Sequence, residues 1–166
     1  MYGDIKCITN MVVKFLKSVI MLTSLLCTFF FSMDVNAEMK VPTVKETEQW
    51  KVELLEPSKD KHFAQSEKGK YEVYSLLVTN QGKKAYNVNI GAFRNEPSNK
   101  KMFGLAPQVE NEIMNAGQTF SFTNFLVKEK TEELECVVTW EDEPVTLKNG
   151  KKASVRKYKE TIVFTP

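Results

Sequence analysis

The stretch Leu134–Trp140 (LECVVTW) decides the fold of this chain. Its hydrophobic side chains recur at every second position, which is the period of a β-strand with one buried face. The strand ends in a large aromatic side chain, as a core strand often does. The side chains predicted to point inward are Leu134, Cys136, Val138 and Trp140.

Similar alternation elsewhere in the chain predicts further strands. They lie at residues 50–55, 71–79, 85–93, 119–127 and 158–164. We interpret 71–79 and 85–93 as a hairpin, because the turn residues of 80–83 (NQGK) join them. Residues 94–101 are expected to form a loop, and 102–107 give an ambiguous pattern.

Asn149-Gly150 predicts a last hairpin between residues 145–148 and 151–156, with positive φ at both turn positions. No segment of the chain after residue 37 has the period of an amphipathic helix. The predicted fold class is therefore all-β, a Greek-key β-sandwich of about seven strands.

The N-terminus has the pattern of a secretory signal peptide over residues 1–37. Lys14 and Lys17 precede an uncharged apolar run, and Val35-Asn36-Ala37 suits cleavage before Glu38. The run has about 15 residues, fewer than the roughly 20 needed to span a bilayer, which favours cleavage. The alternative is a membrane-anchored accessory protein that retains residues 1–33 as a signal anchor. Met1 and Met11 both remain possible starts.

Three domains of the chain follow from these patterns. Residues 1–37 are the signal peptide, 38–48 a flexible lead-in, and 49–166 the β-sandwich domain.

With 23 Lys+Arg and 21 Asp+Glu, the chain has no charge excess of the kind that binds nucleic acid. Cleavage would leave Cys136 as the only cysteine, so no disulfide could form within the exported chain.

Three stretches together resemble the immunoglobulin-like modules of exported bacterial proteins. They are residues 75–90 (YSLLVTNQGKKAYNVNI), 115–123 (NAGQTFSFT) and 134–142 (LECVVTWED), and the resemblance covers about residues 50–165. It implies an immunoglobulin-like Greek-key sandwich with a binding or structural role. It transfers no functional residues, and the paired cysteines of antibody domains are absent.

The residues that usually carry catalysis are sparse. His62 is the only histidine and lies in a polar loop, while Cys136 is predicted to be an inert buried thiol. One histidine and one exported cysteine cannot build a zinc site, and we expect no cofactor. Glu141-Asp142-Glu143 is interpreted as a solvated loop in preference to a cation site. These features predict a protein that is not an enzyme.

One local concentration of positive charge remains. It could contact an anionic surface such as lipid headgroups or a wall polyanion. The interpretation that the sequence favours is protection of an exposed strand edge against aggregation. The residues are Lys148, Lys151, Lys152, Arg156, Lys157 and Lys159.

The resulting hypothesis is an exported, non-enzymatic binding or structural module. Its partner would be an unidentified protein or a component of the cell envelope, reached through loops or a strand edge. Attachment to a membrane is expected only if the signal segment stays uncleaved.

Overall fold

The computed structural model describes residues 38–96, 99–153 and 155–166. The description below concerns these residues, which belong to the unit Asn36–Pro166. The predicted signal peptide lies outside the described residues. Within them the chain forms strands and no helix, so the predicted all-β class is confirmed.

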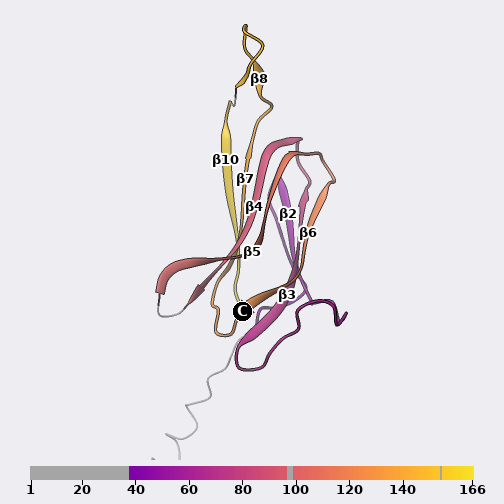
Figure 1. The fold of residues 1–166 in the computed structure, drawn as a ribbon, viewed down its shortest axis with the longest axis vertical. Coiled ribbons are helices and arrows are strands. Elements are labelled where there is room, and N and C mark those ends of the chain that lie inside the picture. Colours follow the sequence, from indigo (N-terminus) through magenta and orange to yellow (C-terminus); the bar gives the residue numbers. More distant parts are fainter. Residues whose placement is uncertain (1–37, 97–98, 154) are drawn as a thin grey trace, which may run out of the picture. The chain divides into compact units, whose positions relative to one another are not determined.

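Eight strands form two four-stranded antiparallel sheets, seen as two layers in Figure 1. The first sheet has the order β1 (Thr43–Glu46), β2 (Trp50–Leu55), β3 (Tyr71–Asn80), β6 (Thr119–Lys128). The second has the order β10 (Lys157–Phe164), β7 (Leu134–Glu141), β4 (Ala85–Glu96), β5 (Asn99–Met114). A separate two-stranded sheet pairs β8 (Val145–Thr146) with β9 (Lys152–Ala153).

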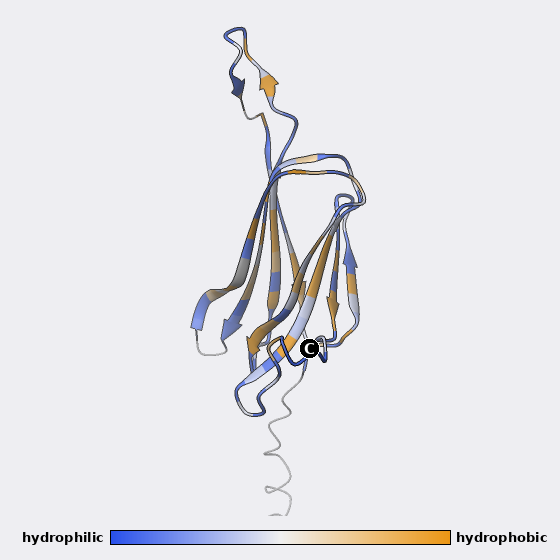
Figure 2. Cartoon of the chain, turned by 45° about the vertical axis from the view of Figure 1, so that its right-hand side comes forward, coloured by the Kyte–Doolittle hydropathy of each residue, from blue (hydrophilic) through white to orange (hydrophobic). Residues whose placement is uncertain are grey.

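The core lies between the two four-stranded sheets and follows the predicted alternation. Every second residue of β2 and β7 is buried, including all four inward positions predicted for β7. Figure 2 shows hydrophobic segments on the strands of both sheets. Trp50 of the first sheet meets Trp140 of the second edge-to-face, with ring centroids 5.4 Å apart. This aromatic contact joins the two sheets.

The predicted hairpin between 71–79 and 85–93 is wrong. β3 pairs with β2 and β6, whereas β4 pairs with β5 and β7, so these consecutive strands belong to different sheets. Alternation identifies the buried face of a strand and says nothing about its hydrogen-bonded neighbour. The short link after Asn80 crosses from one sheet to the other, and both strands bury a face in the same core.

Two strands are absent from the sequence prediction. β5 runs over residues that were expected to be partly a loop, and β4 continues to Glu96. β5 lies at the edge of its sheet and most of its described side chains are exposed or half-buried, so it lacks a hydrophobic period. β1 lies within the predicted flexible lead-in, where the expectation of irregular structure is wrong for Thr43–Glu46 because this segment pairs with β2.

One end of the two-sheet domain is organised by a fully buried asparagine, Asn80. Its Nδ2 donates to the carbonyl oxygens of Lys83, at 2.9 Å, and Met114, at 2.8 Å. Its Oδ1 accepts from Gln49 Nε2, at 2.7 Å, and from the Gly82 backbone N–H, at 3.1 Å. The amide thus uses its full hydrogen-bonding capacity. Its partners lie in the links after β1 and β3 and at the end of β5.

A second buried asparagine, Asn124, lies in β6 and holds the long loop of residues 56–70. Its Nδ2 donates to the carbonyl oxygens of Ser58, at 2.8 Å, and Ala64, at 2.9 Å. Its Oδ1 accepts from the Ser58 backbone N–H, at 2.7 Å, and from Ser75 Oγ, at 3.3 Å. Asn124 has a positive φ of 51°, a conformation that asparagine tolerates better than most residues.

Candidate functional site

The hairpin between β7 and β10 extends beyond both sheets, and we call residues 142–156 the finger. The ladder of β7 and β10 ends at the pair Glu141 and Lys157, and the Asp142 N–H then donates to the Arg156 carbonyl at 3.1 Å. Farther out, β8 pairs with β9. Figure 1 shows β8 projecting past the ends of the four-stranded sheets.

The tip of the finger is a tight turn, as Asn149-Gly150 predicted. Leu147 N–H donates to the Lys151 carbonyl at 2.8 Å, and Gly150 N–H donates to the Leu147 carbonyl at 2.9 Å. Gly150 has a φ of 78°, but Asn149 is not among the described residues with positive φ. The prediction of positive φ at both positions is wrong, because the loop has three residues and needs only one left-handed position.

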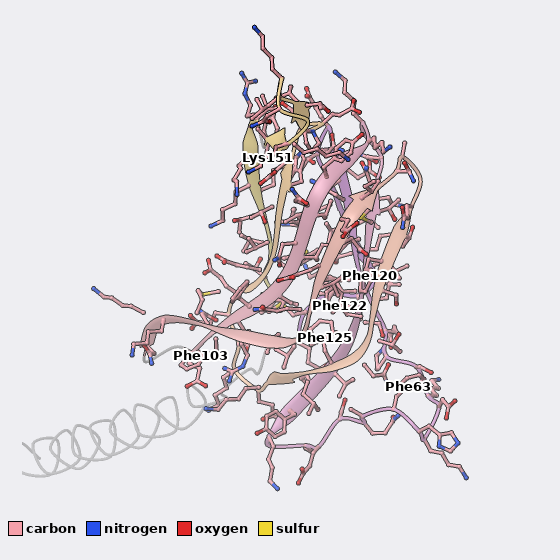
Figure 3. All side chains as sticks on the ribbon, turned by 45° about the horizontal axis from the view of Figure 1, so that its top comes forward. Phe63, Phe103, Phe120, Phe122, Phe125 and Lys151 are labelled. Carbon is pink, nitrogen blue, oxygen red and sulfur yellow. The ribbon has the colours of Figure 1, made fainter. Side chains whose placement is uncertain are left out.

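The surface of the finger combines positive charge with aliphatic side chains. Lys148, Lys151 and Lys152 are exposed. Figure 3 shows Lys151 at the opposite end of the domain from Phe63. The sequence from Pro144 to Val155 contains no Asp or Glu. Three aliphatic side chains of the finger are also unusually exposed: Val145 (50%), Leu147 (46%) and Val155 (56%).

The other three predicted basic residues are placed differently. Arg156 lies at the base of the finger, where a hydrogen bond with Tyr158 raises its pKa. Lys157 Nζ pairs with Glu141 Oε1 at 2.9 Å. Lys159 is exposed on β10, at the edge of its sheet. The structure therefore separates the six residues into three near the finger tip and three at the finger base and along β10.

The carboxylates at the finger base are not a uniformly solvated loop. Glu141 is only 6% exposed, and its Oε2 accepts from Asn87 Nδ2 at 2.8 Å. Asn87 has a φ of 47° where the register of β4 against β7 shifts, so a bulge turns its amide toward Glu141. The solvated interpretation is wrong for Glu141. The Asp142 side chain accepts a hydrogen bond from Tyr158 Oη at 2.9 Å.

A cavity of about 390 Å³ lies beside the finger base, and we call it the Trp140 pocket. Its walls come from both sheets and from segments far apart in the sequence, so no single motif could have indicated it. The aromatic residues near strand ends were one signal in the sequence. The lining residues are Glu48, Gln49, Gly82, Lys83, Lys84, Trp140, Asp142, Tyr158 and Glu160.

An aromatic stack forms one wall of the Trp140 pocket. The rings of Tyr158 and Trp140 are stacked, with centroids 5.2 Å apart and planes inclined by 16°. Trp140 in turn packs against Trp50 in the core. Because Trp140 is only 9% exposed, Tyr158 is the ring of this stack that is more open to solvent.

The remaining candidates for chemistry are placed as follows. Cys136 is buried, and burial raises the pKa of its thiol to about 12, which makes it a poor nucleophile. His62 is exposed, and its N–H donates to Asp60 within the loop. In the described part of the chain, no group of three or more His, Cys, Asp and Glu side chains is arranged to hold a metal ion. That part also contains no helix long and apolar enough to cross a membrane.

Together the fold and the finger define an all-β protein with a projecting cationic hairpin. The chain belongs to the family described as YozF-like secreted proteins, whose model matches residues 35–166. It is 32% identical over 166 residues to "Uncharacterized protein YozF" of Bacillus subtilis (strain 168), covering 92% of this chain and 96% of that protein. No solved structure matches the chain. The predicted secreted location is confirmed by this family.

Proposed function

We propose that the domain is an immunoglobulin-like binding module that acts outside the cell without catalysis, and that its finger binds the anionic surface of a lipid membrane. The strand order supports the immunoglobulin-like part. The chain crosses between sheets after β3, after β5 and after β6, and β10, β7 and β4 lie side by side. Such crossings are typical of Greek-key sandwiches of this class.

The surroundings of the reactive side chains support a role without catalysis. Cys136 is enclosed by the core, and His62 lies in an exposed loop where its N–H donates to Asp60. A binding role agrees with the position of the finger, since recognition surfaces are often carried on loops held by a rigid scaffold.

One observation carries the membrane proposal: the finger exposes three lysines and three aliphatic side chains on one projecting hairpin. Lysines are attracted to anionic headgroups by about 1 kcal/mol each near the surface. Exposed aliphatic side chains gain further free energy by entering the headgroup boundary. A soluble polyanion would use the lysines and leave the aliphatic side chains in water.

Edge protection accounts for fewer of the basic residues than the sequence suggested. It suits Lys159, which lies along the exposed edge strand β10. It does not account for the lysines of the finger, because β8 and β9 have two residues each and present almost no strand edge.

Sedimentation of the secreted protein with lipid vesicles tests the proposal. We expect binding to phosphatidylglycerol vesicles, weak binding to phosphatidylcholine vesicles, and loss of binding between 0.1 and 1 M salt as screening increases. The variant Lys148→Gln/Lys151→Gln/Lys152→Gln should bind phosphatidylglycerol about 100-fold more weakly, from about 1 kcal/mol per lysine.

The matched control removes the same charge from the opposite end of the domain, where Lys59, Lys61 and Lys68 are exposed in the 56–70 loop. Their triple Gln variant should bind like the wild type. Equal losses in both triple variants would contradict a role for the finger. A Val145→Ser/Leu147→Ser variant should also bind more weakly, and unchanged binding would favour a soluble polyanion over a membrane.

A further inference from the structure

We propose that the Trp140 pocket is a binding site for an amino sugar. The pocket is independent of the membrane proposal, because the exposed lysines and aliphatic side chains of the finger tip do not line it. Its volume of about 390 Å³ falls in the range of small-molecule sites. It combines a supported aromatic ring with several carboxylates, and these two features define the ligand.

The aromatic feature is the ring of Tyr158. One side of this ring stacks on Trp140, which is braced from behind by Trp50. Its hydroxyl donates to Asp142 Oδ2 at 2.9 Å, so both the plane and the direction of the ring are held. A fixed and partly exposed aromatic ring suits a ligand with a flat, weakly polar face, such as the C–H face of a pyranose.

The second feature is Glu160, a carboxylate at an inward position of its strand. Tyr158, Glu160, Ile162 and Phe164 alternate along β10, and the last two are buried in the core. Glu160 itself is half-buried, and a carboxylate contributes little to packing on a face that is otherwise apolar. Among the described residues, its buried Oε2 has no hydrogen-bond donor.

A carboxylate oxygen that is buried without a donor reduces the stability of the fold. Because Glu160 lines the pocket, rotation of its side chain would turn this oxygen toward a ligand that supplies a donor. Hydroxyl and ammonium groups both supply donors, and an ammonium group also matches the negative charge. Glu160 therefore selects a ligand with N–H or O–H groups.

The carboxylate of Glu160, more than the net charge of the pocket, favours the ammonium group over an anion. Glu48, Asp142 and Glu160 contribute three carboxylates, against the ammonium groups of Lys83 and Lys84. Arg156, which hydrogen-bonds Tyr158, offsets the charge of Asp142. The Lys84 ammonium lies over the ring of Tyr86, 5.1 Å from its centroid, and is thereby partly engaged. A pyranose carrying a protonated amine meets both the aromatic and the acidic features.

Titration calorimetry of the secreted protein with D-glucosamine, D-glucose and N-acetyl-D-glucosamine tests the ligand class. At a pH where the amine of glucosamine is protonated, we expect glucosamine to bind about tenfold or more tightly than the other two, as a charge-assisted hydrogen bond would give. Absence of glucosamine binding, or equal binding of all three sugars, would overturn the proposal. This comparison uses only the wild-type protein.

Glu160→Gln tests the assigned residue. It should weaken glucosamine binding about tenfold or more while leaving the unfolding temperature unchanged or higher, because the carboxylate oxygen Oε2 has no hydrogen bond to lose in the free protein. The matched control is Lys159→Gln. Lys159 precedes Glu160 on the same strand, but its side chain is exposed and does not line the pocket. Unchanged affinity in Glu160→Gln, or the same loss in Lys159→Gln, would contradict the site.

Discussion

The two ends of the domain each contain a buried asparagine with four side-chain hydrogen bonds, but the two residues stabilise different parts of the fold. Asn80, at the finger end, bonds to the ends of strands and links that belong to both sheets. Asn124, at the other end, bonds mainly to the 56–70 loop outside the first sheet. The same chemistry therefore supports the whole fold at one end and a single loop at the other.

Replacement of Asn80 should give the largest effect. Asn80→Ala would remove the four hydrogen bonds of the amide, at about 1 kcal/mol for each bond, while the Gly82 N–H keeps its other bond to the Gln49 carbonyl. We expect a loss of about 3–4 kcal/mol in the free energy of unfolding, measured by urea denaturation. A loss below about 1 kcal/mol would show that water replaces the amide and that the two ends do not differ.

Replacement of Asn124 should give a smaller and more local effect. Asn124→Ala removes the bonds to Ser58 and Ala64, so hydrogen exchange should increase mainly within residues 56–70. Its φ of 51° adds strain for alanine that glycine avoids. Asn124→Gly should therefore be more stable than Asn124→Ala by about 1 kcal/mol while exposing the loop equally. Uniformly faster exchange across both sheets would contradict a local role.

Cys136 provides a reference between the two ends, because it belongs to the core itself. Burial raises its thiol pKa from 9.0 to about 12, so the folded state keeps a proton that the unfolded state releases above pH 9. Stability should consequently fall as the pH rises through this range, by about 1.4 kcal/mol near pH 10. Cys136→Ala should lack this part of the pH dependence. If the free energy of unfolding fell with pH equally in the variant and the wild type, the contribution of the Cys136 thiol would be contradicted.

The sequence predicted those parts of the fold that depend on one buried face. Strand 50–55 and strand 134–140 followed from alternation, because each contacts the core through every second side chain. Edge strand β5 could not be found this way, since few of its side chains enter the core. The partner of β3 was also misjudged, because it depends on a crossing link whose buried amide, Asn80, has no periodic signal.

The two candidate sites also differ in whether the sequence could predict them. The finger was predictable because Asn149-Gly150 and its lysines are adjacent in sequence. The Trp140 pocket was not, since Gln49, Lys83 and Tyr158 meet only after the sheets have packed. The alternation of β10 places Glu160 on the inward face. A carboxylate at that position indicates that this strand has a role besides packing against the core.

The continuity of the finger with β7 and β10 also has a mechanical consequence. If the tip were held on a surface and the C-terminus pulled away, the tension would run along β10. Its register with β7 extends from Lys157↔Glu141 to Phe164↔Leu134, with hydrogen bonds across the direction of pull. The load would pass from one end of β10 to the other through its extended backbone, so a finger attached at its tip would transmit force to the C-terminus without peeling a strand away.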